Sequence, residues 1–173
     1  MRLTRRTLVA GAAAALALPG WRGTRAAAPA EIVMRGTGDG AHVWFDPAGL
    51  LVPPGTTVRW TNREEGNAHT STAYHPANYD RPRRIPADAT PWDSDYLLPG
   101  ESFAVTLEVP GVYDFFCIPH EHAGMVGRIV VGAVPADWHG WPDGDLPAVA
   151  LAAFPAAETI VAAGTVPARG GKA

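Results

Sequence analysis

Residues 117–125 contain a thiol, an imidazole and a thioether that could bind one soft metal ion, in the order Cys117-Ile118-Pro119-His120-Glu121-His122-Ala123-Gly124-Met125. A tight loop would bring the thiol of Cys117 and the imidazole of His120 to one centre. The four residues between His120 and Met125 let the chain turn back, so that the thioether approaches from the side. Sulfur ligands mixed with imidazole suit copper in either oxidation state, whereas magnesium and calcium prefer oxygen ligands and zinc more often takes a fully tetrahedral set.

A second imidazole would complete a trigonal set of two nitrogens and one sulfur, with a weak axial thioether. His69 is the candidate because it follows the turn Asn62–Asn67 and leads into a strand. His75 is the alternative, but it stands before Pro76 in a turn-rich segment. A trigonal site needs little rearrangement between Cu(II) and Cu(I), and a filled set leaves no position for a substrate. The pattern therefore favours electron transfer over bond making.

Short strands separated by turns must position these residues. The chain contains 17 prolines and 19 glycines, a density that disfavours a helical bundle. Alternating or apolar runs without intervening helices predict an antiparallel Greek-key β-sandwich. The expected strands are Glu31–Arg35, His42–Phe45, Thr56–Thr61, Ser102–Val109, Val112–Ile118 and Met125–Val131.

The loop and the Tyr113-x-Phe115-x-Cys117 approach to it resemble the plastocyanin and pseudoazurin branch of the cupredoxins, the small blue copper proteins, over about residues 31–132. The resemblance implies one type 1 copper per chain in an eight-stranded, cupredoxin-like sandwich. It implies that His69, Cys117 and His120 bind the copper and that Met125 is axial. Family members often have asparagine after the first histidine, which ties the two ligand loops together, but this chain has Thr70.

The resemblance further implies a carrier of single electrons, not an enzyme, that binds a donor and an acceptor protein transiently, with the electron leaving through the edge of His120. One alternative is a periplasmic copper-handling protein, but Met34 and Met125 are the only methionines besides Met1. The other is a type 1 copper subunit of a larger redox enzyme. A second complete ligand set is missing from the sequence, which argues against catalysis by this chain alone.

Residues 1–30 have the features of an export signal, namely Arg5-Arg6, an apolar run over residues 8–18 and an Ala-Pro-Ala cleavage site at 28–30. The paired arginines favour the twin-arginine type over an ordinary Sec signal. We therefore expect a periplasmic or otherwise exported protein, without a membrane span after residue 30. Beyond this segment nine basic residues accompany 17 acids, a formal charge of −8, which argues against nucleic-acid binding. We expect a monomer.

Two segments exceed the minimal family fold. Residues 74–98 form a turn-rich excursion, in which Arg81, Arg83 and Arg84 make a basic run that is either a solvated loop or a docking patch. Residues 133–173 form an Ala/Pro-rich C-terminal extension in which Pro155–Ala163 predicts a short helix.

Three smaller features have plain expectations. Trp138, His139 and Trp141 should cover the sandwich. His122 should point away from the metal, as a solvated histidine or a docking contact, and Glu64-Glu65 should be a polar turn.

Overall fold

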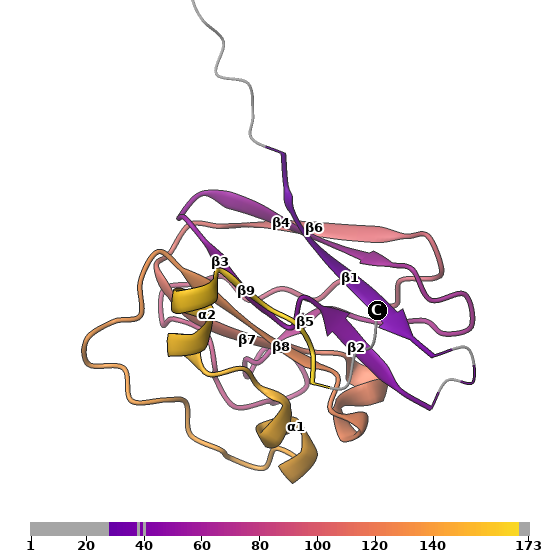
Figure 1. Ribbon diagram of the computed structural model, residues 1–173. Helices are drawn as coiled ribbons and strands as arrows, with labels where there is room; N and C mark the ends of the chain where they lie inside the picture. Colours follow the sequence, from indigo (N-terminus) through magenta and orange to yellow (C-terminus); the bar gives the residue numbers. More distant parts are fainter. Residues whose placement is uncertain (1–27, 38, 40, 170–173) are drawn as a thin grey trace, which may run out of the picture.

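The computed structural model describes residues 28–37, 39 and 41–169, so the predicted export segment lies outside the described residues except for its last three. Two β-sheets pack face to face, and two short helices cover one of them (Figure 1). The first sheet has the order β2-β1-β4-β6 and the second β5-β7-β8-β3-β9. In chain order the elements are β1 Ala30–Gly36, β2 Val43–Asp46, β3 Gly49–Val52, β4 Thr56–Asn62, β5 Thr72–Ala73, β6 Ser102–Leu107, β7 Gly111–Phe116, the 3-10 helix η1 Ile118–Ala123, β8 Val126–Val131, α1 Ala148–Ala153, α2 Ala157–Ala163 and β9 Thr165–Val166.

The β-sandwich is confirmed, but the expectation of purely antiparallel sheets was wrong. Strand β1 pairs in parallel with β4, and β3 pairs in parallel with β8. The chain crosses to the other sheet between the members of each pair, so it can re-enter a sheet in the same direction. All six expected strands are present within a few residues, whereas β3, β5 and β9 were not predicted. These three strands are too short to show a clear pattern in the sequence. Strand β3 is a four-residue apolar run directly before Pro53-Pro54, and β5 and β9 have two residues each.

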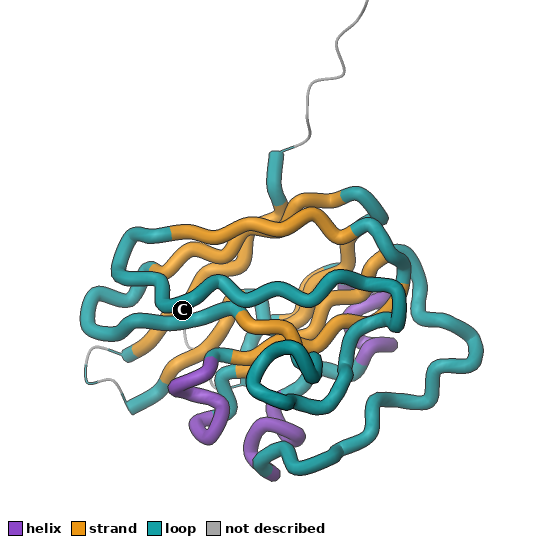
Figure 2. The backbone as a smooth tube through the Cα atoms, turned by 180° about the vertical axis from the view of Figure 1, so that it is seen from behind, coloured by secondary structure: helices purple, strands orange, loops and turns teal. Residues whose placement is uncertain are grey.

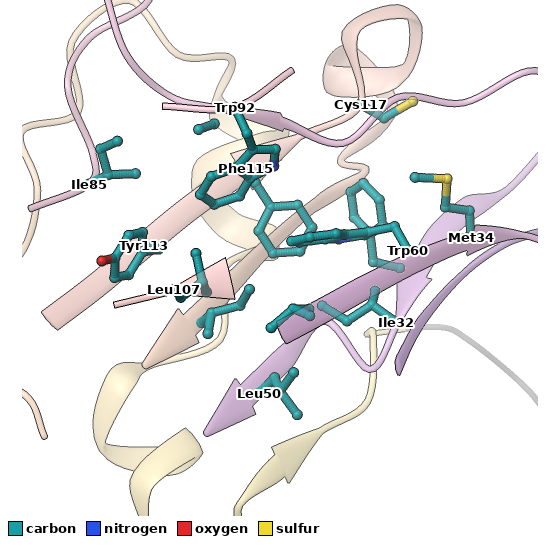
Figure 3. Packing of buried hydrophobic residues seen from close by; sticks show 14 of the residues in the cluster. Ile32, Met34, Leu50, Trp60, Ile85, Trp92, Leu107, Tyr113, Phe115 and Cys117 are labelled. Atoms are coloured by element: carbon teal, nitrogen blue, oxygen red, sulfur yellow. The ribbon is translucent and has the colours of Figure 1, made fainter. Parts of the chain in front are cut away.

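The core between the sheets is built around aromatic rings (Figure 3). Phe115 of β7 packs edge-on against Phe45 of β2 and Trp60 of β4, with ring centroids 4.7 and 5.4 Å apart. Gly127 of β8 leaves room for the Phe115 ring, because a Cβ at that position would overlap it. Cys117 lies at one end of this cluster and is fully buried (Figure 3). The rings thus fix the strand that carries the thiol.

The C-terminal extension covers the outer face of the second sheet (Figure 1). Every residue of β7 and β8 is buried, so these strands have no face open to water. Ile160 of α2 packs on Val112 and Val130, and Phe154, which follows α1, packs with Phe116. The predicted helix at 155–163 is present as α2, while α1 was not predicted. Trp138 and Trp141 also pack over this face, as expected.

The excursion at 74–98 folds back onto the sandwich instead of leaving it. Seen from behind, loop covers much of this side of the molecule (Figure 2). Ile85, Trp92 and Leu97 from this segment are buried in the main core. Leu97 also pairs with His69 as an isolated β-bridge, with backbone N–H···O bonds of 2.8 and 3.1 Å. The excursion therefore belongs to the wall of the predicted metal site.

Candidate metal centre

Two imidazoles and the thiol converge at one end of the sandwich. Cys117 Sγ lies 3.6 Å from His69 Nδ1 and 3.4 Å from His120 Nδ1. Three donors about 2.1 Å from the centre of a trigonal plane stand about 3.6 Å apart, so these spacings fit one metal ion. Within the described residues, His69, Cys117 and His120 are the one group of three His, Cys, Asp or Glu side chains close enough to share an ion.

The end of β7 and the turn of η1 place Cys117 and His120. Cys117 directly follows β7, and Pro119 lies in the first turn of the 3-10 helix in which His120 lies. The expected tight loop is a helical turn, which brings residue 120 back over residue 117 through a His120 N–H to Cys117 O bond of 3.0 Å. Gly124 ends the turn with a φ of 80°, a left-handed conformation that glycine adopts without strain.

Met125 lies directly after this turn and is fully buried. Its N–H donates to His120 O at 3.1 Å, and its carbonyl accepts from Cys117 N–H at 3.0 Å. The backbone of Met125 is therefore bonded to both ligand residues of the turn. Its side chain belongs to the same buried cluster as Cys117.

His69 is oriented by a buried carboxylate that was mistaken for part of a polar turn. Glu64 is only 7% exposed, and its Oε2 lies 2.6 Å from His69 Nε2. The carboxylate accepts from Nε2–H, which leaves Nδ1 free to face the thiol. Asn67 donates to the other oxygen of Glu64, and a Cβ at Gly36 would overlap this carboxylate. Asn67 and Gly36 thus form a close-fitting site around the carboxylate of Glu64.

Thr70 ties the two ligand loops together in place of asparagine. Its backbone N–H donates to Cys117 Sγ at 3.3 Å, and its hydroxyl accepts from Ile118 N–H at 2.9 Å. The loop after β4 is therefore bonded to both residues that flank the start of η1.

Burial sets the protonation of the metal-free donors. It raises the pKa of the Cys117 thiol to about 12. Burial lowers the pKa of His69, although its bond to Glu64 partly opposes the shift, and it also lowers the pKa of His120. Both imidazoles are thus neutral at pH 7, the form that binds metals.

The other histidines and charges lie elsewhere. His75 is outside the cluster, and its Nδ1 accepts from Ala77 N–H. His122 is exposed on η1. The basic run is neither a solvated loop nor a docking patch as a whole, because Arg84 is buried against Asp114 and Arg81 binds Glu121.

The sequence does not reveal the role of Glu121, because an acidic residue between two histidines is usually exposed to solvent. It is buried within η1, where it accepts from Tyr74 O–H at 2.7 Å and from Arg81. The excursion therefore holds the ligand loop from outside the sandwich.

Known proteins are similar to this chain in sequence and fold. Residues 32–132 match the family of copper binding proteins described as plastocyanin/azurin. The chain is 40% identical over 105 residues to the chloroplastic plastocyanin of Tetradesmus obliquus, covering 60% of this chain and 68% of that protein. It is 36% identical over 123 residues to that of Hordeum vulgare, covering 71% and 72%. A Sinorhizobium pseudoazurin structure is 27% identical with a TM-score of 0.56, covering 79% of this chain and 98% of that one.

The donor set, its spacing and these similarities agree on the metal and the fold. The chain belongs to the plastocyanin/azurin family of copper-binding proteins.

Proposed function

We propose that this protein is an exported type 1 copper protein that carries single electrons between larger redox proteins. His69, Cys117 and His120 would hold the copper, with Met125 as the axial ligand. The observation that carries the proposal is the convergence of Cys117 Sγ with two imidazole Nδ1 atoms at 3.4 and 3.6 Å. When bound, copper supplies exchange of one electron between its two common oxidation states.

The protein contributes a rigid set of ligands and a route by which a partner protein can approach the metal site. His69 is buried and bonded to Glu64, whereas His120 is partly exposed. The ring of His120 therefore gives a partner a short route to the site, while the remaining donors stay shielded from water. Fixed ligands lower the rearrangement needed when an electron arrives or leaves. The net negative charge beyond residue 30 would favour transient, salt-sensitive encounters.

The spectrum of the copper-loaded protein tests this assignment. The mature chain with Cu(II) should show an intense thiolate-to-copper band, and Cys117→Ser should abolish it. His75→Ala is the matched control and should keep the band, because His75 lies outside the cluster. Retained colour in Cys117→Ser would overturn the ligand assignment.

Electron exchange separates the carrier from the copper-handling alternative. A carrier should pass an electron to an oxidised cytochrome c without losing copper, and a chelator should remove the ion slowly. A colourless ion that a chelator removes at once would instead favour metal handling. A bound copper that reacts only when mixed with another enzyme chain would favour the subunit alternative.

Export is the remaining part of the proposal. In the part of the chain that the structure describes, the helices are all too short to cross a membrane. Replacing Arg5-Arg6 with Lys-Lys should retain the unprocessed chain in the cytoplasm if the signal is of the twin-arginine type. Continued export and processing would indicate the Sec route.

The oligomeric state is tested separately. Size-exclusion chromatography of the processed chain should give a monomer.

A further inference from the structure

A chain of hydroxyls links the ligand loop to the excursion. Ile118 N–H donates to Thr70 Oγ1 at 2.9 Å, and Thr70 Oγ1 lies 3.0 Å from Thr72 Oγ1. Thr72 O–H in turn donates to Asp93 Oδ1 at 2.9 Å. Both threonines are fully buried, so water cannot replace the bond between their hydroxyls, while Ile118 and Asp93 at the two ends of the chain are partly exposed.

The directions of the bonds follow from the single hydrogen on each hydroxyl. Because Thr72 gives its hydrogen to Asp93, it can only accept from Thr70. Thr70 must therefore donate to Thr72 and accept from Ile118 N–H. The carboxyl group of Asp93 thus fixes the orientation of a hydroxyl that contacts the metal-binding turn. Cooperative polarisation strengthens each bond of such a chain.

The backbone holds Asp93 in place independently of its side chain. Residues 72 and 93 form an isolated β-bridge, with flanking bonds from Ala73 N–H to Trp92 O at 2.9 Å and from Ser94 N–H to Ser71 O at 3.0 Å. A substitution at residue 93 can therefore remove the carboxyl group without releasing the strand pairing.

We propose that Asp93, acting through Thr72 and Thr70, is a positioning residue for the Cys117–His120 turn. The hydroxyl pair and its terminal carboxylate replace the single asparagine that this chain lacks. The proposal deepens the proposed function, because it assigns the residue of the excursion that orders the copper ligands.

Hydrogen exchange of the Ile118 amide tests the proposal on the metal-free protein. Thr72→Val keeps the size of the side chain but removes the acceptor for Thr70, so Ile118 N–H should exchange about fivefold faster, the effect of losing one hydrogen bond. Thr72→Ser keeps the hydroxyl and should exchange as the wild type does. Thr106→Val is the matched control, since Thr106 forms a hydroxyl pair with Thr57 at 2.8 Å in the other sheet. It should leave Ile118 unchanged.

Copper dissociation provides the second readout. Loss of an outer contact to a metal site commonly weakens it by about 10-fold, so the rate of copper loss to a chelator should rise by that factor in Thr72→Val and Asp93→Ala. A folded Thr72→Val with wild-type Ile118 exchange overturns the proposal. Wild-type Ile118 exchange in a folded Asp93→Ala overturns it equally, whether or not Thr72→Val folds. A wild-type protein without the thiolate band would contradict the proposed function, while the exchange result would still decide the role of Asp93.

Discussion

At the scale of single residues, the sequence predicts some parts of the metal site more readily than others. Cys117 and His120 are three positions apart, so local spacing alone predicts that they meet. His69 required knowledge of which loop lies opposite. Glu64 could not be found, because a buried acid and a solvated acid look the same in a turn such as Glu64-Glu65. Its burial follows from Gly36, far away in the chain, which leaves space for the carboxylate.

Removing the charge of Glu64 should raise the reduction potential of the copper. Glu64→Gln keeps an acceptor for His69 Nε2–H but removes a negative charge that favours the more positive oxidation state. Glu64→Ala should in addition weaken copper binding by about 10-fold, because His69 loses its partner. Voltammetry and chelator competition measure the two effects. Glu65→Gln, at the exposed neighbour, is the control and should change neither quantity.

Copper uptake should release one proton per chain near pH 7.5. Burial raises the pKa of the Cys117 thiol to about 12, so the thiol is protonated in the metal-free fold, while both imidazoles are already neutral. Because a thiolate must form, apparent affinity should rise about tenfold per pH unit between pH 7.5 and 9. Calorimetry in buffers of different ionisation enthalpy counts the proton. Release of two or more protons would show that an imidazole also titrates.

At the scale of elements, the turn η1 is fixed from both sides by parts of the chain that lie outside the minimal fold. Glu121 binds Tyr74 and Arg81 of the excursion, and Gly124 lies against Val149 of α1. Helix α1 was missed because the run Ala148–Ala153 begins after Pro147 without a side-chain cap. Its helical form depends on packing against the sheet and η1, which no local pattern reveals.

Gly124→Ala should destabilise the fold more than Gly100→Ala. Both glycines have a positive φ, of 80° and 87°, so alanine costs about 1 kcal/mol at either site. A Cβ at Gly124 would also meet Val149 Cγ2 at 3.3 Å, whereas nothing lies within 4 Å of one at Gly100. Urea unfolding of the metal-free variants should therefore show the larger loss for Gly124→Ala. An equal loss would mean that α1 yields easily at this contact.

At the scale of the whole molecule, one buried carboxylate joins the sandwich, the excursion and the extension. Asp114 of β7 accepts from Arg84 at 2.9 Å and from Arg128 at 2.7 Å. The same arginines donate to the carbonyls of Pro142 and Pro155 in the extension. The sequence showed the sandwich by its alternation, but this three-way junction joins residues far apart in the chain and leaves no local pattern.

Asp114→Ala should cost about 3–5 kcal/mol of unfolding free energy, because it leaves two buried guanidinium groups without their carboxylate. Asp46→Ala is the control. The side chain of Asp46 is 42% exposed and that of its partner Arg35 is 50% exposed, so this ion pair should contribute at most about 1 kcal/mol. Chemical unfolding followed by tryptophan fluorescence compares the two. A small loss in Asp114→Ala would mean that apolar packing alone holds the extension.

Strand β9 gives the extension one more role, which concerns how copies of the protein behave toward one another. It pairs with Gly49 and Leu50 of β3, and Gly164 O accepts from Leu51 N–H at 2.7 Å. Without it, β3 would end its sheet with a row of free backbone groups, a template on which another chain can add a strand. Strand β9 therefore leaves this sheet with an edge of only two residues, which should limit edge-to-edge aggregation between copies of the protein.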